Sequence, residues 1–286
     1  MVKIISDSTC DLSKNLIEKY NISILPLHIL LGNDEYKDSV NITPDDIYKW
    51  SDKNHSTPKT SAPSLEDTIQ HFKPFIDNGD EIVCFSVSKE MSTSCNVMNI
   101  AAEELDAADR IFVVDSANLS TGVGLLVIEA AIMAANGKSG KEISDKMKDL
   151  KPLVRSSFVV DTLTYLHRGG RCSSVAALAG SVLKLHPKIV VEKGKMEVAK
   201  KYRGKMDSVI LSYVRDLEEQ LKNAKTERVF ITHSGCDEAV LDSVRSYLEE
   251  LNIFNEILVT RAGGVISSHC GYGTLGVLFI SNQVTI

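Results

Sequence analysis

The amino-acid sequence predicts an α/β fold of two α/β domains, the first with a mainly parallel sheet and the second with a mixed sheet that contains a β-hairpin. A chain of 286 residues, 43% of them hydrophobic, is long enough to bury roughly two cores. Apolar runs alternate with helix-period patterns, as in βαβ units. Residues 185–202 instead resemble two strands around Lys193-Gly194-Lys195, which indicates antiparallel pairing. We place the domains at residues 1–157 and 158–286.

The first domain is predicted to alternate strands and helices. Val2 to Ser6 forms a buried strand, and a helix follows near Asp11 to Tyr20. Pro26 places the next apolar run, Ile22 to Leu31, at a sheet edge or splits it. Thr43-Pro44-Asp45-Asp46 predicts a helix start, with an N-cap, a proline and two carboxylates. The later elements are a helix after Ser64, a strand at Glu81–Val87, a helix after Ser94, a strand at Arg110–Val114, an apolar helix from Ser120 to near Gly137, a charged helix at Lys141–Lys151 and a strand at Ser156–Val160.

The second domain is predicted to mix antiparallel and parallel strands. Gly169-Gly170, between Arg168 and Arg171, favours either a helix stop or a contact with an anion. The elements after it are a helix near Ser173–Lys184, a hairpin of Leu185–Glu192 and Met196–Tyr202, a helix near Asp207–Ala224, a strand at Arg228–Thr232, a helix at Asp237–Leu251, a strand at Glu256–Thr260 and a last strand to Ile280.

Polar side chains gather where three strands of the first domain end. Asp7-Ser8-Thr9, Ser92-Thr93-Ser94 and Asp115-Ser116 each follow a predicted strand. Because the carboxyl ends of parallel strands share one sheet edge, we expect a polar pocket there. The second cluster also lies at a predicted helix start, where free amides favour an anion. Thr60 and Ser61 lie between two prolines, in what we expect to be a stiff loop that ends at the N-cap Ser64.

Composition and motifs argue against several functions. A net charge of −6 disfavours nucleic-acid binding, and no apolar run is long enough to span a membrane. An early acidic residue argues against a signal peptide, so we expect a cytoplasmic protein. The six cysteines form no Cys-x-x-Cys pair and no two histidines have i, i+4 spacing, so we expect no disulfide, metal or cofactor. Gly271-x-Gly273-x-x-Gly276 lies ten residues from the end of the sequence, too late for a dinucleotide fingerprint.

His269 is the histidine most suited to a function, because serines and glycines surround it. One alternative is a serine hydrolase in which Ser92 is the nucleophile and His269 the base. Asp7 or Asp115 would then orient the imidazole. This alternative stays open at the level of the sequence, because catalytic triads are recognised by geometry and not by order in the chain.

Taken together and in order, the polar blocks resemble those of the DegV family. The blocks are Ser6-Asp7-Ser8-Thr9, Lys59-Thr60-Ser61-Ala62-Pro63-Ser64, Met91-Ser92-Thr93-Ser94, Val114-Asp115-Ser116, Tyr165-Leu166-His167-Arg168-Gly169-Gly170-Arg171 and His269-Cys270-Gly271-Tyr272-Gly273-Thr274-Leu275-Gly276. They span nearly the whole chain, which makes the set specific although each block alone is weak.

The resemblance implies two α/β domains that bind a long-chain fatty acid. The first domain would carry the carboxylate site, with Thr60 and Ser92 as its ligands, and the second would close the lipid pocket. The residues that would support the site are Ser61, Thr93, Ser94, Arg171 and His269. Hydroxyls suit a buried carboxylate because they donate hydrogen bonds, and each buried methylene contributes about 0.8 kcal/mol.

The same resemblance implies a partner and no catalysis by this chain. DegV proteins are akin to the subunits that present a fatty acid to a separate ATP-dependent fatty acid kinase, and transient contact with a membrane is compatible with that role. Three residues depart from the family pattern. Ala62 replaces a frequent glutamine, Thr93 replaces a common glycine, and Tyr272 lies within the last glycine block. We expect Thr93 to alter the local backbone, because β-branched residues disfavour positive φ.

Overall fold

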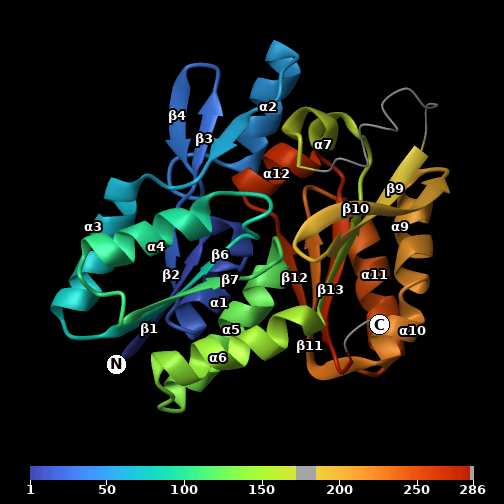
Figure 1. Ribbon diagram of the computed structural model, residues 1–286. Coiled ribbons are helices and arrows are strands. Elements are labelled where there is room, and N and C mark those ends of the chain that lie inside the picture. Colours follow the sequence, from blue (N-terminus) through green and yellow to red (C-terminus); the bar gives the residue numbers. More distant parts are fainter. Residues whose placement is uncertain (172–184, 284–286) are drawn as a thin grey trace.

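The computed structural model describes residues 1–171 and 185–283, and its ribbon shows two sheets with helices around and between them (Figure 1). The helix predicted near Ser173–Lys184 lies outside the described residues. The two-domain α/β architecture predicted from the sequence is confirmed. The predicted border between residues 157 and 158 stays a prediction, and it falls inside β8 (Val154–Val159), a strand of the second sheet.

The first sheet has four parallel strands in the order β2-β1-β6-β7. One face packs against α3 and α4, and the other against α1, α5 and α6. The predicted parallel alternation is therefore correct. The elements are β1 (Val2–Asp7), η1 (Ser8–Cys10), α1 (Lys14–Lys19), β2 (Ser23–Leu25), α3 (Leu65–Asp77), β6 (Glu81–Ser86), α4 (Ser94–Glu104), β7 (Ile111–Asp115), α5 (Thr121–Ala135) and α6 (Gly140–Leu150).

The second sheet has six strands in the order β10-β9-β8-β13-β11-β12. Only the pair β11-β12 is parallel, so the sheet is mixed, and β9 and β10 form the predicted hairpin. The helices α9, α10 and α11 cover its outer face. The bounds are η2 (Lys151–Leu153), α7 (Thr164–Gly169), β9 (Leu185–Glu192), β10 (Lys195–Arg203), α9 (Met206–Arg215), α10 (Glu218–Lys222), β11 (Ala224–His233), α11 (Glu238–Glu250), β12 (Glu256–Arg261), α12 (Gly264–Cys270) and β13 (Leu275–Ser281).

Helix α5 lies between the two sheets and contacts strands of both (Figure 1). Ten of its fifteen residues are buried, on every side of the helix. A helix that is apolar all round has to be covered all round, which one sheet face cannot do. The inner face of the second sheet supplies the remaining cover through residues such as Phe230 and Leu278.

A small third sheet, in the order β4-β3-β5, was not predicted. It consists of β3 (His28–Leu31), β4 (Asp34–Lys37) and β5 (Lys59–Ser61), and α2 (Pro44–Asn54) packs beside it. Pro26 splits the predicted strand of residues 22–31 between two sheets, which was one of the two options for that proline. The stiff loop predicted around Thr60 is wrong in part: its middle is β5, because the flanking prolines keep the backbone extended and an edge strand tolerates them.

Two predicted helices are shorter than expected. The helix predicted from Asp11 begins only at Lys14, because Asp11 has left-handed backbone (φ 51°) and Ser13 is the N-cap. The helix predicted at residues 207–224 is broken between α9 and α10, and its last residue, Ala224, begins β11. The predicted caps are confirmed: Thr43 forms a capping box with Asp46, and Ser64 accepts a hydrogen bond from the Asp67 amide. In the described residues, no helix is long and apolar enough to cross a membrane.

Tyr213 joins two central strands of the second sheet, and we expect its hydroxyl to be important for stability. The buried hydroxyl donates to the Ser157 carbonyl at 2.7 Å and accepts from the Val277 amide at 2.9 Å. Tyr213→Phe leaves that amide unsatisfied and should lower the free energy of unfolding by about 1–3 kcal/mol, measured by urea denaturation. The control is Tyr247→Phe, whose half-buried hydroxyl donates to Glu218; an equal loss there would contradict the prediction.

Candidate functional site

The polar strand ends of the first sheet meet at one edge, as predicted. β1, β6 and β7 are neighbours and run parallel, so the segments after them lie side by side. Asp7, at the end of β1, accepts hydrogen bonds from the Thr9 amide at 3.1 Å and from the Val87 amide at 2.8 Å. Its carboxylate thereby holds the segment that leads from β6 to Ser92. Burial raises the pKa of Asp7 to about 6.

Thr60 and His269 are brought together from opposite ends of the chain. Thr60 lies in β5, paired with Ile29, and His269 lies in α12. The Thr60 Oγ1 and His269 Nε2 atoms are 2.7 Å apart. This hydrogen bond joins two of the predicted site residues, which lie 209 positions apart in the chain.

Gly169 allows His269 to pack against the end of α7. A Cβ atom on Gly169 would lie 2.4 Å from the His269 Nδ1 atom, so no larger residue fits without moving the ring. Gly170 has left-handed backbone (φ 66°) and ends α7, which confirms the helix-stop interpretation of the Gly-Gly pair. The contact between Gly169 and His269 is a site feature that sequence reasoning missed.

The imidazole of His269 is neutral at pH 7. Burial, with a smaller contribution from the positive charge of Arg171, lowers the pKa of His269 to about 4. Nδ1 is buried and has no hydrogen-bond partner in the described residues. With its proton on Nε2, the ring donates to Thr60 Oγ1, and the Thr60 hydroxyl is then free to donate to a ligand oxygen.

The second hydroxyl cluster forms the start of α4, as predicted. Ser92 is half-buried and its Oγ lies 2.8 Å from the Oγ of the buried Ser94. The Ser94 amide donates to Ser92 Oγ at 3.3 Å. Thr93 is exposed and has φ −84°, so this position does not require left-handed backbone and threonine fits without strain.

Among the described residues, none of the other predicted site residues hydrogen-bonds the side chain of Thr60 or His269. In the described part of the chain no hydrogen bond joins Ser92 to Thr60 or His269. Ser61 is exposed, and the exposed Arg171 donates to the Gly169 carbonyl at 2.6 Å. The Ser92–His269 hydrolase has no support in this geometry, because the base faces Thr60 and no acid among the described residues orients its Nδ1.

An apolar group, here named the α12 cluster, lies beside both polar segments. Met91 packs against it next to Ser92, and Ile266 and Cys270 belong to it on either side of His269. A cavity of about 20 Å³, roughly the space of one water molecule, lies between some of its members and polar residues such as Ser120 and Ser234. The buried members of the cluster are Val87, Leu119, Phe158, Val160, Leu166, Ile189, Met196, Ala262, Ile266 and Cys270.

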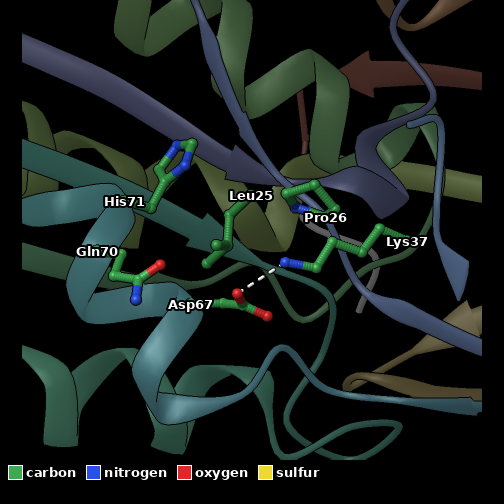
Figure 2. A pocket seen from close by; sticks show the side chains of 6 residues that line it. All are labelled: Leu25, Pro26, Lys37, Asp67, Gln70 and His71. Atoms are coloured by element: carbon green, nitrogen blue, oxygen red, sulfur yellow. Dashed lines mark hydrogen bonds and ion pairs between the residues drawn. The ribbon is translucent and has the colours of Figure 1, made fainter. Parts of the chain in front are cut away.

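A larger pocket of about 230 Å³ lies between α3 and the small sheet, and Figure 2 shows its lining. Asp67 on α3 faces Lys37 on β4, with Oδ1 and Nζ 2.7 Å apart (Figure 2). The Oδ2 atom of Asp67 lies 2.9 Å from His28 Nε2. The other two polar side chains of the lining pair outside it, His71 with Ser23 and Gln70 with Glu66. We interpret the contacts of Asp67 with Lys37 and His28 as structural, because they hold α3 against the small sheet that carries Thr60. The sequence held no signal for these contacts.

The described residues hold no group of three or more His, Cys, Asp or Glu side chains suited to a metal ion. The five cysteines among them, Cys10, Cys84, Cys95, Cys236 and Cys270, are free thiols. Tyr272 is 55% exposed, and its ring meets that of Tyr48 edge-on at 5.6 Å. This departure from the family pattern therefore sits at the surface, beside α2.

The fold and the site define a two-domain α/β protein with a polar site where the domains meet. The chain belongs to the DegV family, whose model matches residues 1–282. A DegV domain-containing protein of Clostridium acetobutylicum is 31% identical over 281 residues, with 98% of each chain covered. One of Clostridium perfringens is 33% identical over 286 residues, with 98% of this chain and 97% of the relative covered.

Solved structures of the family share the fold. A fatty-acid-binding DegV family protein of Thermus thermophilus superposes with a TM-score of 0.89 at 28% identity, with 98% of this chain and 99% of that chain covered. A stearic acid-binding protein of Eubacterium ventriosum superposes with a TM-score of 0.85 at 30% identity, with 98% of each chain covered. The expectations of family and fold class are confirmed.

The lowered pKa of His269 predicts a pH dependence of stability. The folded-state pKa of about 4 lies below the ordinary 6.5, so the unfolded chain binds more protons between these values. The free energy of unfolding should therefore fall as the pH is lowered through this window, by up to about 1.4 kcal/mol per pH unit from this group. Urea unfolding of the wild type and of His269→Gln checks it. The variant should lose less stability on acidification, and an equal loss would refute this assignment.

Proposed function

We propose that this protein binds a long-chain fatty acid, with the carboxylate held by Thr60 and Ser92. The observation that carries the proposal is the Thr60–His269 hydrogen bond of 2.7 Å beside the α12 cluster, which sets a polar donor against an apolar core. With its proton on Nε2, His269 donates to Thr60, which leaves the Thr60 hydroxyl able to donate to an anion. The relatives of known structure that bind fatty acids support the same ligand.

The acyl tail would enter the α12 cluster. Met91 and Ile266 belong to the same segments as Ser92 and His269, so the polar and apolar partners of one ligand lie together. A cavity of about 20 Å³ is far below the roughly 300 Å³ of a typical ligand pocket. Binding therefore requires the side chains of the cluster to move apart, and the tail replaces the contacts that they lose.

Mass spectrometry of organic extracts of the purified protein tests this proposal. We expect a co-purified fatty acid, or tight binding of one that is added. Affinity should rise by about fourfold for each added methylene while the chain still fits, because each contributes about 0.8 kcal/mol. Absence of both a co-purified and a bound fatty acid would refute the function.

Removal of both hydroxyls should weaken binding of the carboxylate. The double variant Thr60→Val, Ser92→Ala loses two donors, and we expect about 10- to 100-fold weaker binding of a fatty acid with little change for its methyl ester. Isothermal calorimetry with both ligands measures this difference. Ser243→Ala, which removes an exposed hydroxyl on α11, is the control. Equal losses for acid and ester would mean that the hydroxyls do not recognise the carboxylate.

We further propose that the chain works in the cytoplasm and presents the bound acid to a separate ATP-dependent fatty acid kinase. A carboxylate oxygen of the ligand would attack the γ-phosphorus of ATP, with release of ADP and formation of an acyl phosphate. The partner would supply this chemistry. Arg171 and Arg168, both exposed at the end of α7 near His269, suit the docking face.

A coupled assay with a purified bacterial fatty acid kinase subunit tests the partnership. In the presence of ATP and hydroxylamine, the loaded protein should yield acyl hydroxamate. Arg171→Ala should lower the rate of its formation more than it lowers fatty acid affinity. Hydroxamate formation no greater than with the kinase alone would rule out the partnership with that kinase.

A further inference from the structure

The start of α12 lacks a capping side chain of its own. Its N-cap is Gly263, which has no side chain to accept hydrogen bonds from the free amides of the first turn. Two remote carboxylates accept them instead. The Gly263 amide donates to Asp11 Oδ1 and the Gly264 amide donates to Asp38 Oδ1, each at 2.8 Å.

These two aspartates come from different parts of the fold. Asp11 follows η1, at the edge of the first sheet, and Asp38 follows β4 of the small sheet. Helix α12 belongs to the second domain and carries His269 near its other end. The edge of the first sheet, the small sheet and α12 therefore meet at two consecutive backbone amides.

The junction is buried and closely packed. Asp11 and Asp38 are 6% and 1% exposed, and Asp38 Oδ2 has no hydrogen-bond partner in the described residues. A Cβ atom on Gly264 would lie 2.7 Å from Ile29 Cδ1 and 2.8 Å from Asp38 Oδ1. Only glycine at position 264 lets α12 come this close to the small sheet. The two carboxylates can then accept hydrogen bonds from the first amides of the helix, and they set where it begins.

We propose that Asp11 and Asp38 are positioning residues that set the start of α12 and so hold His269 against Thr60. The helix is only seven residues long, so a displacement at its start reaches His269 within about one and a half turns. Ile29 pairs with Thr60 in the small sheet and also borders Gly264 at the start of α12. The small sheet therefore contacts α12 both at its start, through Ile29, and near its end, through Thr60 and His269. The relevance to the ligand rests on the proposed function.

Both aspartates act as buried hydrogen-bond acceptors. Burial raises the pKa of Asp11 to about 8, while the hydrogen bonds that it accepts from the Ser120 hydroxyl and the Gly263 amide oppose the shift. Burial also raises the pKa of Asp38, and the hydrogen bond from the Gly264 amide opposes that shift. An asparagine at either position keeps an acceptor oxygen and carries no charge, which makes it the conservative replacement.

The test compares Asp38→Ala, Asp38→Asn and the control Asp80→Ala in the full chain. Asp80 is a similarly buried aspartate that pairs with the N-terminal amine at the start of β6. In spectra of ¹⁵N-histidine-labelled, ligand-free protein, we expect the His269 ring resonances to shift in Asp38→Ala only. Stearate should bind about tenfold more weakly to Asp38→Ala, and within about threefold of the wild type to the other two.

Unchanged His269 resonances in a folded Asp38→Ala variant would overturn the proposal. If that variant does not fold, amide hydrogen exchange of the wild type decides: the Gly263 and Gly264 amides should be protected, and exchange at the rate of an unfolded chain would overturn it. The spectra need no ligand. A wild type that binds neither stearate nor any other fatty acid would therefore refute the proposed function and leave the positioning role to be decided by the spectra.

Discussion

The burial of α5 is the constraint on which the rest of the structure depends. Its residues are apolar on all sides, and ten of the fifteen are buried. Because one sheet covers only one side of a helix, the two sheets have to face each other across it. Each Å² of buried apolar surface contributes roughly 25 cal/mol, and α5 buries such surface against both sheets. The helix therefore links the stabilities of the two domains. The polar ends of β1, β6 and β7 are thereby brought opposite the second sheet.

The short helix α12 is the second element that contacts several parts of the fold, and glycines allow its close packing. Gly264 lets it approach the small sheet, and Gly169 lets the end of α7 lie against the His269 ring. The ring is consequently dry and neutral, and its Nε2 meets Thr60 at 2.7 Å. The same contacts that desolvate the imidazole therefore also orient it.

Most regular elements could be predicted because their signals are local. Thr43 and Ser64 begin helices where their side chains cap the first turn, and the Gly-Gly pair ends α7. The errors fall where distant partners decide. The segment around Thr60, which its prolines keep extended, becomes a strand by pairing with β3. Ala224 leaves the predicted helix to begin β11, which pairs with the last strand of the chain.

The sequence by itself determined the α/β class, the polar strand ends and the block order that resembles the DegV family, because hydrophobic period, caps and motifs are properties of neighbouring residues. It also singled out Thr60 and His269 separately. Their contact, the close approach of Gly169 and the hold of Asp11 and Asp38 on α12 were decided by the tertiary structure alone. These contacts join residues up to 252 positions apart, and such pairs form only when the packing of α5 and the sheets brings them together.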